Sequence, residues 1–342
     1  MIEIIISLII SFFITYLTIP LILLLSKRYT DLLKIPNLIA SHSKAIPTYG
    51  GVAIFFGIIL SFFILLKIGD VDGVQWIMGS LFIVFFLGLI DDSITLRPSK
   101  KFLGQLIAII IIVYFNDLRI TSMHGLFFIY ELPYITSFLL TVLTMLVITN
   151  AYNLIDGIDG LAALIGLLVS SVFFVFLFLQ NDINFAIILS AIIGALIAFL
   201  RYNWHPAQIF MGDTGSLVVG FLLSIIAVQF VETDFQIESQ WFQIKTPTLA
   251  MAILIIPLQD LLRVFIVRLA QKKSPFSGDR NHLHHLLMDK GLTQIQTAIT
   301  LLLFNLLVII AALFLGFLNI NYVLLLICGL GVLFLIIINK SK

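Results

Sequence analysis

Long runs of apolar residues are the feature that most constrains how this chain can fold. A helix needs about 20 apolar residues to cross a bilayer. Candidate runs cover residues 2–25, 49–67, 74–90, 102–115, 134–152, 160–180, 183–201, 214–231, 246–270, 295–317 and 320–339. The sequence therefore predicts an all-α polytopic membrane protein with about eleven transmembrane helices.

Composition excludes most other classes of protein. Apolar residues make up 61% of the 342-residue chain and charged residues 11%, whereas soluble domains carry about 25% charged residues. A net charge of +1 without a basic block argues against a nucleic-acid binder, and a single cysteine excludes a disulfide framework. With no internal repeat and no polar linker, we expect one integral membrane domain over residues 1–342.

The distribution of Lys and Arg predicts the orientation of the chain. Cytoplasmic loops of membrane proteins are enriched in both residues, and 15 of the 19 lie in one alternating set of loops and in the C-terminal tail. This places the N-terminus outside and the C-terminus in the cytoplasm, which requires an odd number of spans. Five of the six His residues and the paired Asp residues fall on the same side, so we expect any chemistry at the cytoplasmic face.

Two adjacent carboxylates, Asp91 and Asp92, close the third run. Negative charge at the C-terminal end of a helix opposes the helix dipole, and neighbouring carboxylates repel each other. The pair therefore indicates a bound cation or a proton transfer, and Lys101 shortly after it suits a site that also holds phosphate. A solvated loop at the end of a span is the alternative interpretation.

Oxygen-bearing side chains recur every three residues after the fifth run, at Asn150, Asn153, Asp156 and Asp159. On a helix or a 3₁₀ turn this spacing is expected to make them converge near the membrane surface, where a hard cation such as Mg²⁺ takes carboxylate and amide oxygens. Gly157 lets the backbone turn or approach a ligand. Caps at a helix end would explain one or two of these residues, but not all of them.

A polar, glycine-containing segment at 203–216 follows the seventh run and includes Asn203, Phe210 and Asp213. Asp213 stands where the N-cap of the eighth helix belongs, which is the plain structural interpretation. The glycines beside it favour close approach of a ligand, and a helix N-terminus favours an anion. Phe210 is either a stacking surface for a flat ring or an interfacial aromatic residue.

The longest cytoplasmic loop carries the sequence DRNHLHH at 279–285. Three His residues in four positions raise the question of zinc, but no Cys lies nearby and the spacing matches no zinc motif. Arg and His side chains can instead donate hydrogen bonds to phosphate or sugar oxygens. The candidates for such contacts are Arg280, His282, His284 and His285, and a solvated basic loop is the remaining interpretation.

These motifs, in this order, resemble the polyprenyl-phosphate N-acetylhexosamine-1-phosphate transferase family over nearly the whole chain. The resemblance rests on IPTYGG at 46–51, Asp91-Asp92 with Lys101, NAYNLIDGIDGL at 150–161, NWHPAQIFMGDTGSL at 203–217 and DRNHLHHLL at 279–287. The His-x-His-His form of the last motif is similar to the branch that uses UDP-GlcNAc or a related UDP-HexNAc. Residues 38–41 depart from the pattern, because many members carry an Arg and a Lys there.

The resemblance implies a role for each motif. The metal ligands would be Asn153 and Asp213, binding Mg²⁺ with Mn²⁺ as a substitute. The catalytic set would be Asp91, Asp92, Lys101, Asp156 and Asp159. Asp91 and Asp92 would face the polyprenyl phosphate, and Lys101 would pair with a phosphate. Asp156 would support the loop or the metal ligands, and Asp159 would lie at the uridine together with Asn203. The residues around the UDP-sugar would be Gly157, Asn203, Phe210, Arg280, His282, His284 and His285, with Phe210 stacking on the uracil.

The implied reaction transfers HexNAc-1-phosphate, in the first instance GlcNAc-1-phosphate, from a UDP-sugar to undecaprenyl phosphate and releases UMP. It would start a lipid-linked cell-envelope polysaccharide at the cytoplasmic face of the bacterial inner membrane, and it is compatible with a homodimer. Direct attack by the lipid phosphate is expected, because phosphoryl transfer needs positioning more than covalent chemistry; a covalent aspartyl intermediate is the alternative. A cation-coupled transporter is the competing function, although transporters usually show repeat symmetry.

Overall fold

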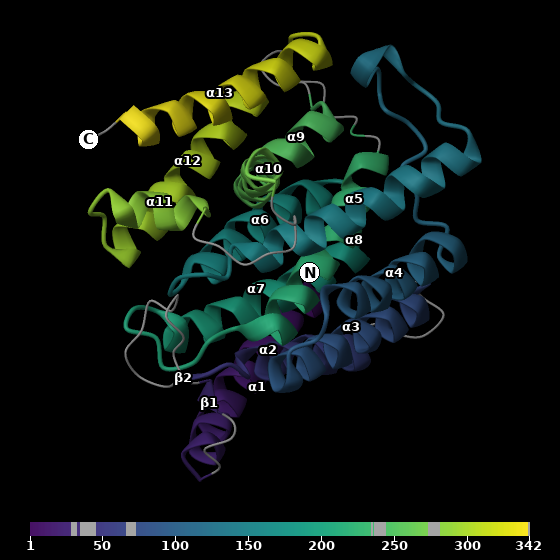
Figure 1. Cartoon of the computed structure of the whole chain (residues 1–342). Helices are drawn as coiled ribbons and strands as arrows, with labels where there is room; N and C mark the ends of the chain where they lie inside the picture. The colour runs from purple at the N-terminus through teal and green to yellow at the C-terminus, as the bar shows by residue number, and fades with distance from the viewer. Residues whose placement is uncertain are drawn as a thin grey trace.

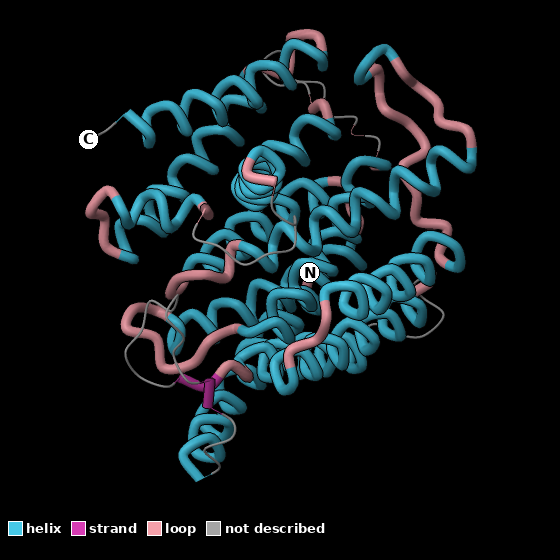
Figure 2. Tube along the Cα trace, in the orientation of Figure 1, coloured by secondary structure: helices cyan, strands magenta, loops and turns pink. Residues whose placement is uncertain are grey.

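The architecture is a bundle of helices (Figure 1; Figure 2). The computed structural model describes residues 1–28, 33–34, 46–65, 73–233, 235, 244–272 and 281–340. Its helices are α1 (Ile2–Arg28), α2 (Gly50–Leu65), α3 (Val74–Ile94), α4 (Pro98–Phe115), α5 (Tyr134–Leu154), α6 (Leu161–Leu179), α7 (Ile183–Asn203), α8 (Gly212–Glu232), α9 (Thr246–Ile253), α10 (Ile255–Ala270), α11 (Leu283–Asp289), α12 (Gln294–Phe314) and α13 (Ile320–Lys340), with a short 3₁₀ helix η2 (Leu126–Phe128). Two-residue strands β1 (Leu33–Lys34) and β2 (Ile46–Pro47) pair antiparallel. The all-α prediction is confirmed.

The number of spans is close to the predicted one. In the described part of the chain, nine helices are long and apolar enough to cross a membrane, and the pair α9 and α10 makes a tenth. The predicted second span is represented by α2, whose 16 residues cover about 24 Å at 1.5 Å per residue, against a hydrocarbon core of about 30 Å. The predicted ninth run is not one straight helix, because the chain breaks at Leu254 and bends by 75°.

Helix α8 lies in the middle of the bundle (Figure 1). Within an apolar stretch of 18 of its residues, 94% are buried. Glycines let its neighbours approach closely, which matters because helix association in a membrane relies on van der Waals packing. A methyl group on Gly51 of α2 would overlap the backbone at Gly215, and one on Gly88 of α3 would lie 2.5 Å from the Cα atom of Thr214. Gly220 faces the backbone of α5 in the same way.

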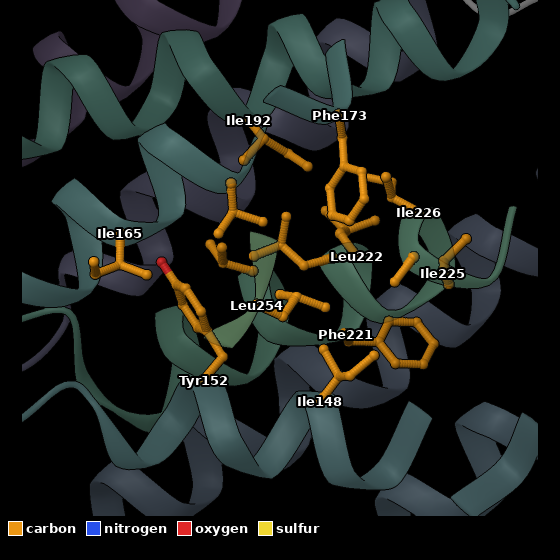
Figure 3. Packing of buried hydrophobic residues seen from close by; sticks show 14 of the residues in the cluster. Ile148, Tyr152, Ile165, Phe173, Ile192, Phe221, Leu222, Ile225, Ile226 and Leu254 are labelled. Carbon is orange, nitrogen blue, oxygen red and sulfur yellow. The ribbon is translucent and has the colours of Figure 1, made fainter. Parts of the chain in front are cut away.

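Apolar side chains fill the space around α8, as Figure 3 shows for Tyr152, Phe173 and Phe221. Tyr152 is fully buried near the end of α5. Its hydroxyl group donates a hydrogen bond of 2.7 Å to the carbonyl oxygen of Ala162 in α6, so the one polar atom of this side chain has a partner. The bond fixes the end of α5 against the start of α6, where several of the predicted site residues lie.

A stripe of hydroxyl side chains attaches α1 to the bundle. Ser7 and Ser11 are buried one turn apart and donate hydrogen bonds of 2.9 and 2.7 Å to backbone carbonyl oxygens of α7. Thr15, one turn further, donates to the carbonyl oxygen of Ala53 in α2 at 3.2 Å. Hydrogen bonds of this kind hold helices together in a bilayer, where apolar burial between helices gives no driving force.

The close packing of α3 on α8 predicts a difference between two glycines of one helix. Replacing Gly88 with Ala is expected to lower the thermal unfolding midpoint of the protein in detergent, because overpacking against a rigid backbone costs about 1–3 kcal/mol. Gly79 is the matched control, since a methyl group there would meet nothing within 4 Å. Gly79→Ala should leave the midpoint unchanged or raise it slightly. Equal midpoints for the two variants would contradict the packing described for α3 and α8.

Candidate active site

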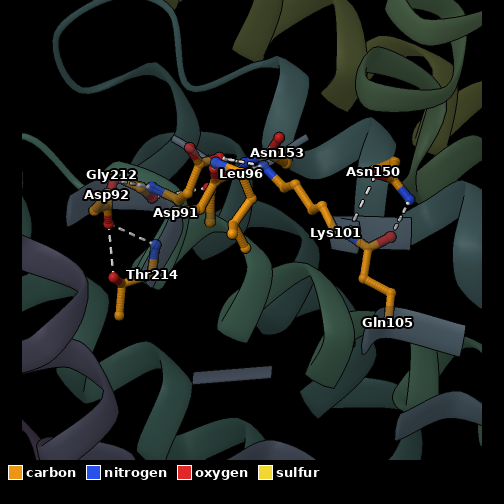
Figure 4. A network of polar contacts seen from close by, with 11 residues as sticks. Asp91, Asp92, Leu96, Lys101, Gln105, Asn150, Asn153, Gly212 and Thr214 are labelled. Atoms are coloured by element: carbon orange, nitrogen blue, oxygen red, sulfur yellow. Dashed lines mark hydrogen bonds and ion pairs between the residues drawn. The ribbon is translucent and has the colours of Figure 1, made fainter. Parts of the chain in front are cut away.

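Polar side chains from four helices gather at one end of the bundle (Figure 4). Asp91 and Asp92 lie in the last turn of α3 and Lys101 in the first turn of α4. Asn153 lies in the last turn of α5 and Asp213 in the first turn of α8. Successive spans reverse direction, so the C-terminal ends of α3 and α5 meet the N-terminal ends of α4 and α8. The structure therefore brings these predicted site residues together.

Lys101 forms a bridge between two carboxylates. Its Nζ atom lies 2.6 Å from Oδ1 of Asp213 and 2.9 Å from Oδ2 of Asp91. The Asp91 side chain is 7% exposed and those of Lys101 and Asp213 are 17% and 26% exposed, so the pair interactions are only partly screened by water. Two carboxylates beside one ammonium leave an excess of negative charge, which favours binding of a further cation.

Asn153 connects the end of α5 to the first turn of α8. Its Nδ2 atom donates to Oδ1 of Asp213 at 2.6 Å and to Oγ of Ser216 at 2.7 Å. The carboxylate of Asp213 and the amide oxygen of Asn153 are the kind of hard donor that Mg²⁺ prefers, so the donor set fits the expected ion. Among the described residues, no group of three or more His, Cys, Asp or Glu side chains is arranged to hold a metal ion. A cation here would complete its shell with water and substrate oxygens, as Mg²⁺ commonly does.

Asp92 caps helix α8 from the end of α3. Its Oδ1 atom accepts from the backbone N–H of Asp213 at 2.9 Å, and its Oδ2 atom accepts from the N–H and the hydroxyl of Thr214 at 2.9 and 2.6 Å. Gly212 suits this contact, because its φ of +70° favours glycine and a Cβ atom would lie 2.7 Å from the carboxylate. The alternative of Asp213 as N-cap is wrong: Met211 takes the cap position without a side-chain bond, and the Asp213 carboxylate faces Lys101.

The polar side chains of the segment 150–160 share one end of the bundle but contact different partners. Asn150 exchanges hydrogen bonds with Gln105 of α4, at 2.8 and 3.3 Å. Asn153 reaches Asp213, whereas Asp159 turns to the segment after α7. Asp156 is half-buried beyond the end of α5. The four side chains therefore lie at one end of the bundle without contacting a common partner, because the α-helix ends at Leu154 and the chain turns before Asp159.

Asp159 and Asn203 join two loops at this end. Oδ2 of Asp159 lies 2.7 Å from Nδ1 of His205. Oδ1 of Asn203 accepts from the N–H of Gly160 at 2.9 Å, while its Nδ2 atom donates to the carbonyl oxygen of Ile209 at 2.8 Å. Both side chains are buried. They therefore hold the segments 155–160 and 203–210 in a fixed relation, and their predicted contact with uridine stays a prediction.

Phe210 is held by the IPTYGG segment. Its backbone N–H donates to the carbonyl oxygen of Pro47 at 2.9 Å, and its carbonyl oxygen accepts from the N–H of Gly50 at 3.0 Å. The side chain is half-buried. The turn at 46–51, weak evidence by itself in the sequence, therefore positions the aromatic residue expected to stack on a flat ring.

The three His residues form a buried cluster beside the segment 150–160. Nδ1 of His282 lies 2.7 Å from Oδ2 of Asp260 in α10. A methyl group on Gly157 would overlap the ring of His284, so the cluster packs on the backbone next to Asn153. Burial, together with the neighbouring His285 and His282, lowers the pKa of His284 well below its usual value. Arg280, predicted with this cluster, lies outside the described residues.

Several residues of the site were missing from the sequence prediction. Thr214 and Ser216 complete the hydrogen bonds at the start of α8, and Gln105 pairs with Asn150. The hydroxyls stand in the GDTGS motif but give no signal distinct from any first turn. Asp260 did give a signal, because an ionisable residue inside an apolar run is a candidate functional residue.

Comparison with known proteins identifies the family. The sequence pattern of glycosyl transferase family 4 matches residues 74–231. The chain is 32% identical to the probable undecaprenyl-phosphate N-acetylglucosaminyl 1-phosphate transferase of Bacillus subtilis (strain 168), over 91% of this chain and 85% of that protein. It is 28% identical to the decaprenyl-phosphate N-acetylglucosaminephosphotransferase of Mycobacterium leprae (strain TN), covering 73% and 68% of the two chains, and 26% identical to the undecaprenyl-phosphate alpha-N-acetylglucosaminyl 1-phosphate transferase of Escherichia coli (strain K12), covering 78% and 72%. The chain belongs to glycosyl transferase family 4.

Proposed function

We propose that this protein transfers GlcNAc-1-phosphate from UDP-GlcNAc to a polyprenyl phosphate and releases UMP. The relatives above are all named as N-acetylglucosaminyl phosphate transferases for undecaprenyl or decaprenyl phosphate. In the reaction an oxygen of the lipid phosphate forms a bond to the sugar-bearing phosphorus, and the bond from that phosphorus to the oxygen of UMP breaks. The distribution of Lys and Arg supports a site on the cytoplasmic face of the bacterial inner membrane.

The observation that carries the proposal is the arrangement of Lys101, Asp91 and Asp213 beside Asn153. A half-buried ammonium group held by two carboxylates is already charged and placed before an anionic substrate arrives, so little reorganisation is needed. The lipid phosphate can then replace one of the two carboxylates that contact Lys101. Asp91 and Asp213 keep the ammonium in place, while Asp92 keeps α3 and α8 in register.

Asn153 and Asp213 would hold Mg²⁺, which supplies charge neutralisation and polarisation of phosphoryl oxygens when it is bound. Phe210 would stack on the uracil, and the His cluster would contact the pyrophosphate and sugar. Both substrates are anionic, so cationic and neutral donors must outweigh their repulsion. In-line transfer then depends on positioning and charge stabilisation.

Turnover by the purified protein tests the proposal directly. With Mg²⁺, undecaprenyl phosphate and UDP-GlcNAc, we expect UMP release that stops when any one component is left out. Asp213→Asn should reduce the rate by about 100-fold or more, because it removes a metal ligand and a partner of Lys101. A helix cap would tolerate the same change. Absence of UMP with every UDP-HexNAc offered would refute the proposed function.

Two adjacent lysines provide a matched pair of variants. Lys101→Met should lower kcat by about 100-fold, because the bridging ammonium would stabilise charge on the phosphates. Lys100→Met is the control, since Lys100 is exposed and makes no salt bridge within the described residues. Its kcat should remain near that of the wild type. Similar losses in both variants, measured as UMP release, would show that Lys101 acts only through general surface charge.

The pKa of His284 predicts how stability depends on pH. Its folded-state pKa is lowered, so the unfolded chain takes up a proton below about pH 6.5 while the folded protein resists it. The thermal unfolding midpoint should therefore decrease as the pH is lowered from about 7.5 to about 5.5. In His284→Gln the midpoint should decrease less over the same range. His124→Gln, on the loop before α5 at the other end of the bundle, should keep the wild-type slope. An unchanged slope in His284→Gln would contradict this assignment.

A further inference from the structure

The carboxylate of Asp260 has no part in the reaction proposed above, yet it is among the most deeply buried charged groups described. It lies in α10, after the bend at Leu254, and is 1% exposed. An ionisable side chain in a membrane segment is costly unless it is paired, and such residues are usually retained for a function. Its partners therefore indicate what it does.

Both oxygens of Asp260 contact the start of α11. Oδ1 accepts from the backbone N–H of Leu283 at 2.6 Å, and Oδ2 lies 2.7 Å from Nδ1 of His282. An ionised carboxylate only accepts hydrogen bonds, so the shared proton lies on Nδ1 of His282. This fixes the tautomer of the ring and leaves its Nε2 atom to accept a hydrogen bond from another group.

The His282 ring is linked to the candidate active site through His284. The two rings lie nearly parallel, with centroids 5.4 Å apart and an interplanar angle of 12°. His284 in turn packs on Gly157, in the segment that begins with Asn153. A ring held by Asp260 is therefore held relative to the residues proposed to bind metal.

We infer that Asp260 is a positioning residue, which fixes the place and tautomer of His282 so that Nε2 accepts a hydrogen bond from a hydroxyl group of the sugar in UDP-GlcNAc. This rests on the function proposed above and deepens it. Carboxylates that orient metal-ligating His residues contribute about 10- to 100-fold to metal affinity or activity, and we expect an effect of similar size on donor use here. The effect should concern the donor substrate alone, because none of the contacts described for Asp260 and His282 involves Lys101 or its two carboxylate partners.

Asp260→Asn separates positioning from folding. The amide oxygen of Asn can still accept from the N–H of Leu283, but its NH₂ group faces Nδ1 and reverses the tautomer of His282. We expect kcat/KM for UDP-GlcNAc to fall by about 10- to 100-fold, while KM for undecaprenyl phosphate and the thermal midpoint stay near wild type. Asp182→Asn is the control: Asp182 caps α7 and accepts from Gln229 at the other end of the bundle, and its loss should leave kcat/KM unchanged.

A double-mutant cycle with His282→Ala identifies the residue through which Asp260 acts. Adding Asp260→Asn to His282→Ala should cause no further loss of kcat/KM for UDP-GlcNAc. Additive losses, or equal losses toward both substrates, would overturn the inference. If Asp260→Asn does not fold, His282→Asn carries the test, because its amide nitrogen can donate to Asp260 and nothing reaches the Nε2 position. That variant should keep the thermal midpoint and lose activity; wild-type activity would overturn the inference.

The same experiment distinguishes failure of the inference from failure of the proposed function. If the wild-type protein releases no UMP from any UDP-HexNAc, the proposed function fails and the assignment of Asp260 fails with it. If the wild-type protein is active and Asp260→Asn matches it toward UDP-GlcNAc, only the assignment of Asp260 fails.

Discussion

The hydrogen bonds between the first turn of α8 and the carboxylate of Asp92 are the contact on which the site depends. The first N–H groups of any helix have no partner within the helix, and here a side chain from α3 supplies one. The close approach of Gly88 to α8 makes this possible. Because Asp92 caps the helix, the carboxylate of Asp213 is directed to Lys101 and Asn153. Loss of the cap would therefore displace several site residues together.

The polar groups of the described site form two parts joined by one stretch of backbone. One part is the bridge of Lys101 between Asp91 and Asp213, suited to phosphate and a divalent cation. The other is the His cluster held by Asp260. The segment from Asn153 to Gly157 lies between them, because it contacts α8 at one end and His284 at the other. A substrate with a nucleotide, a pyrophosphate and a sugar needs several contact points of this kind.

Much of the fold could be predicted because a bilayer leaves the backbone few choices. In hydrocarbon every N–H and C=O group must be satisfied within the chain, so each long apolar run became helical. The bend at Leu254 was not predicted, since the apolar run at 246–270 does not locate the break. Asp213 was expected to face the site and does, but the N-terminus of α8 is capped by Asp92, which is far away in the sequence. Local spacing cannot reveal such a partner.

The residues 150–160 show the same limit. Their spacing of three predicted that they lie at one surface, and it could not assign Asn150 to Gln105 or Asp159 to His205, because those partners depend on how helices pack. The role of Asp260 had a sequence signal, a charge inside an apolar run, but its partner was visible only after folding. Sequence patterns therefore identified the candidate site residues, but they did not identify the partners that those residues contact.

The central claim is that the site transfers a sugar together with its phosphate. The most direct test follows the β-phosphate of UDP-GlcNAc, labelled isotopically, through one turnover with undecaprenyl phosphate and Mg²⁺. The label is expected in the lipid product, as a pyrophosphate that carries GlcNAc, while the unlabelled α-phosphate leaves in UMP. Label recovered in released UDP, with the sugar alone on the lipid, would contradict the account.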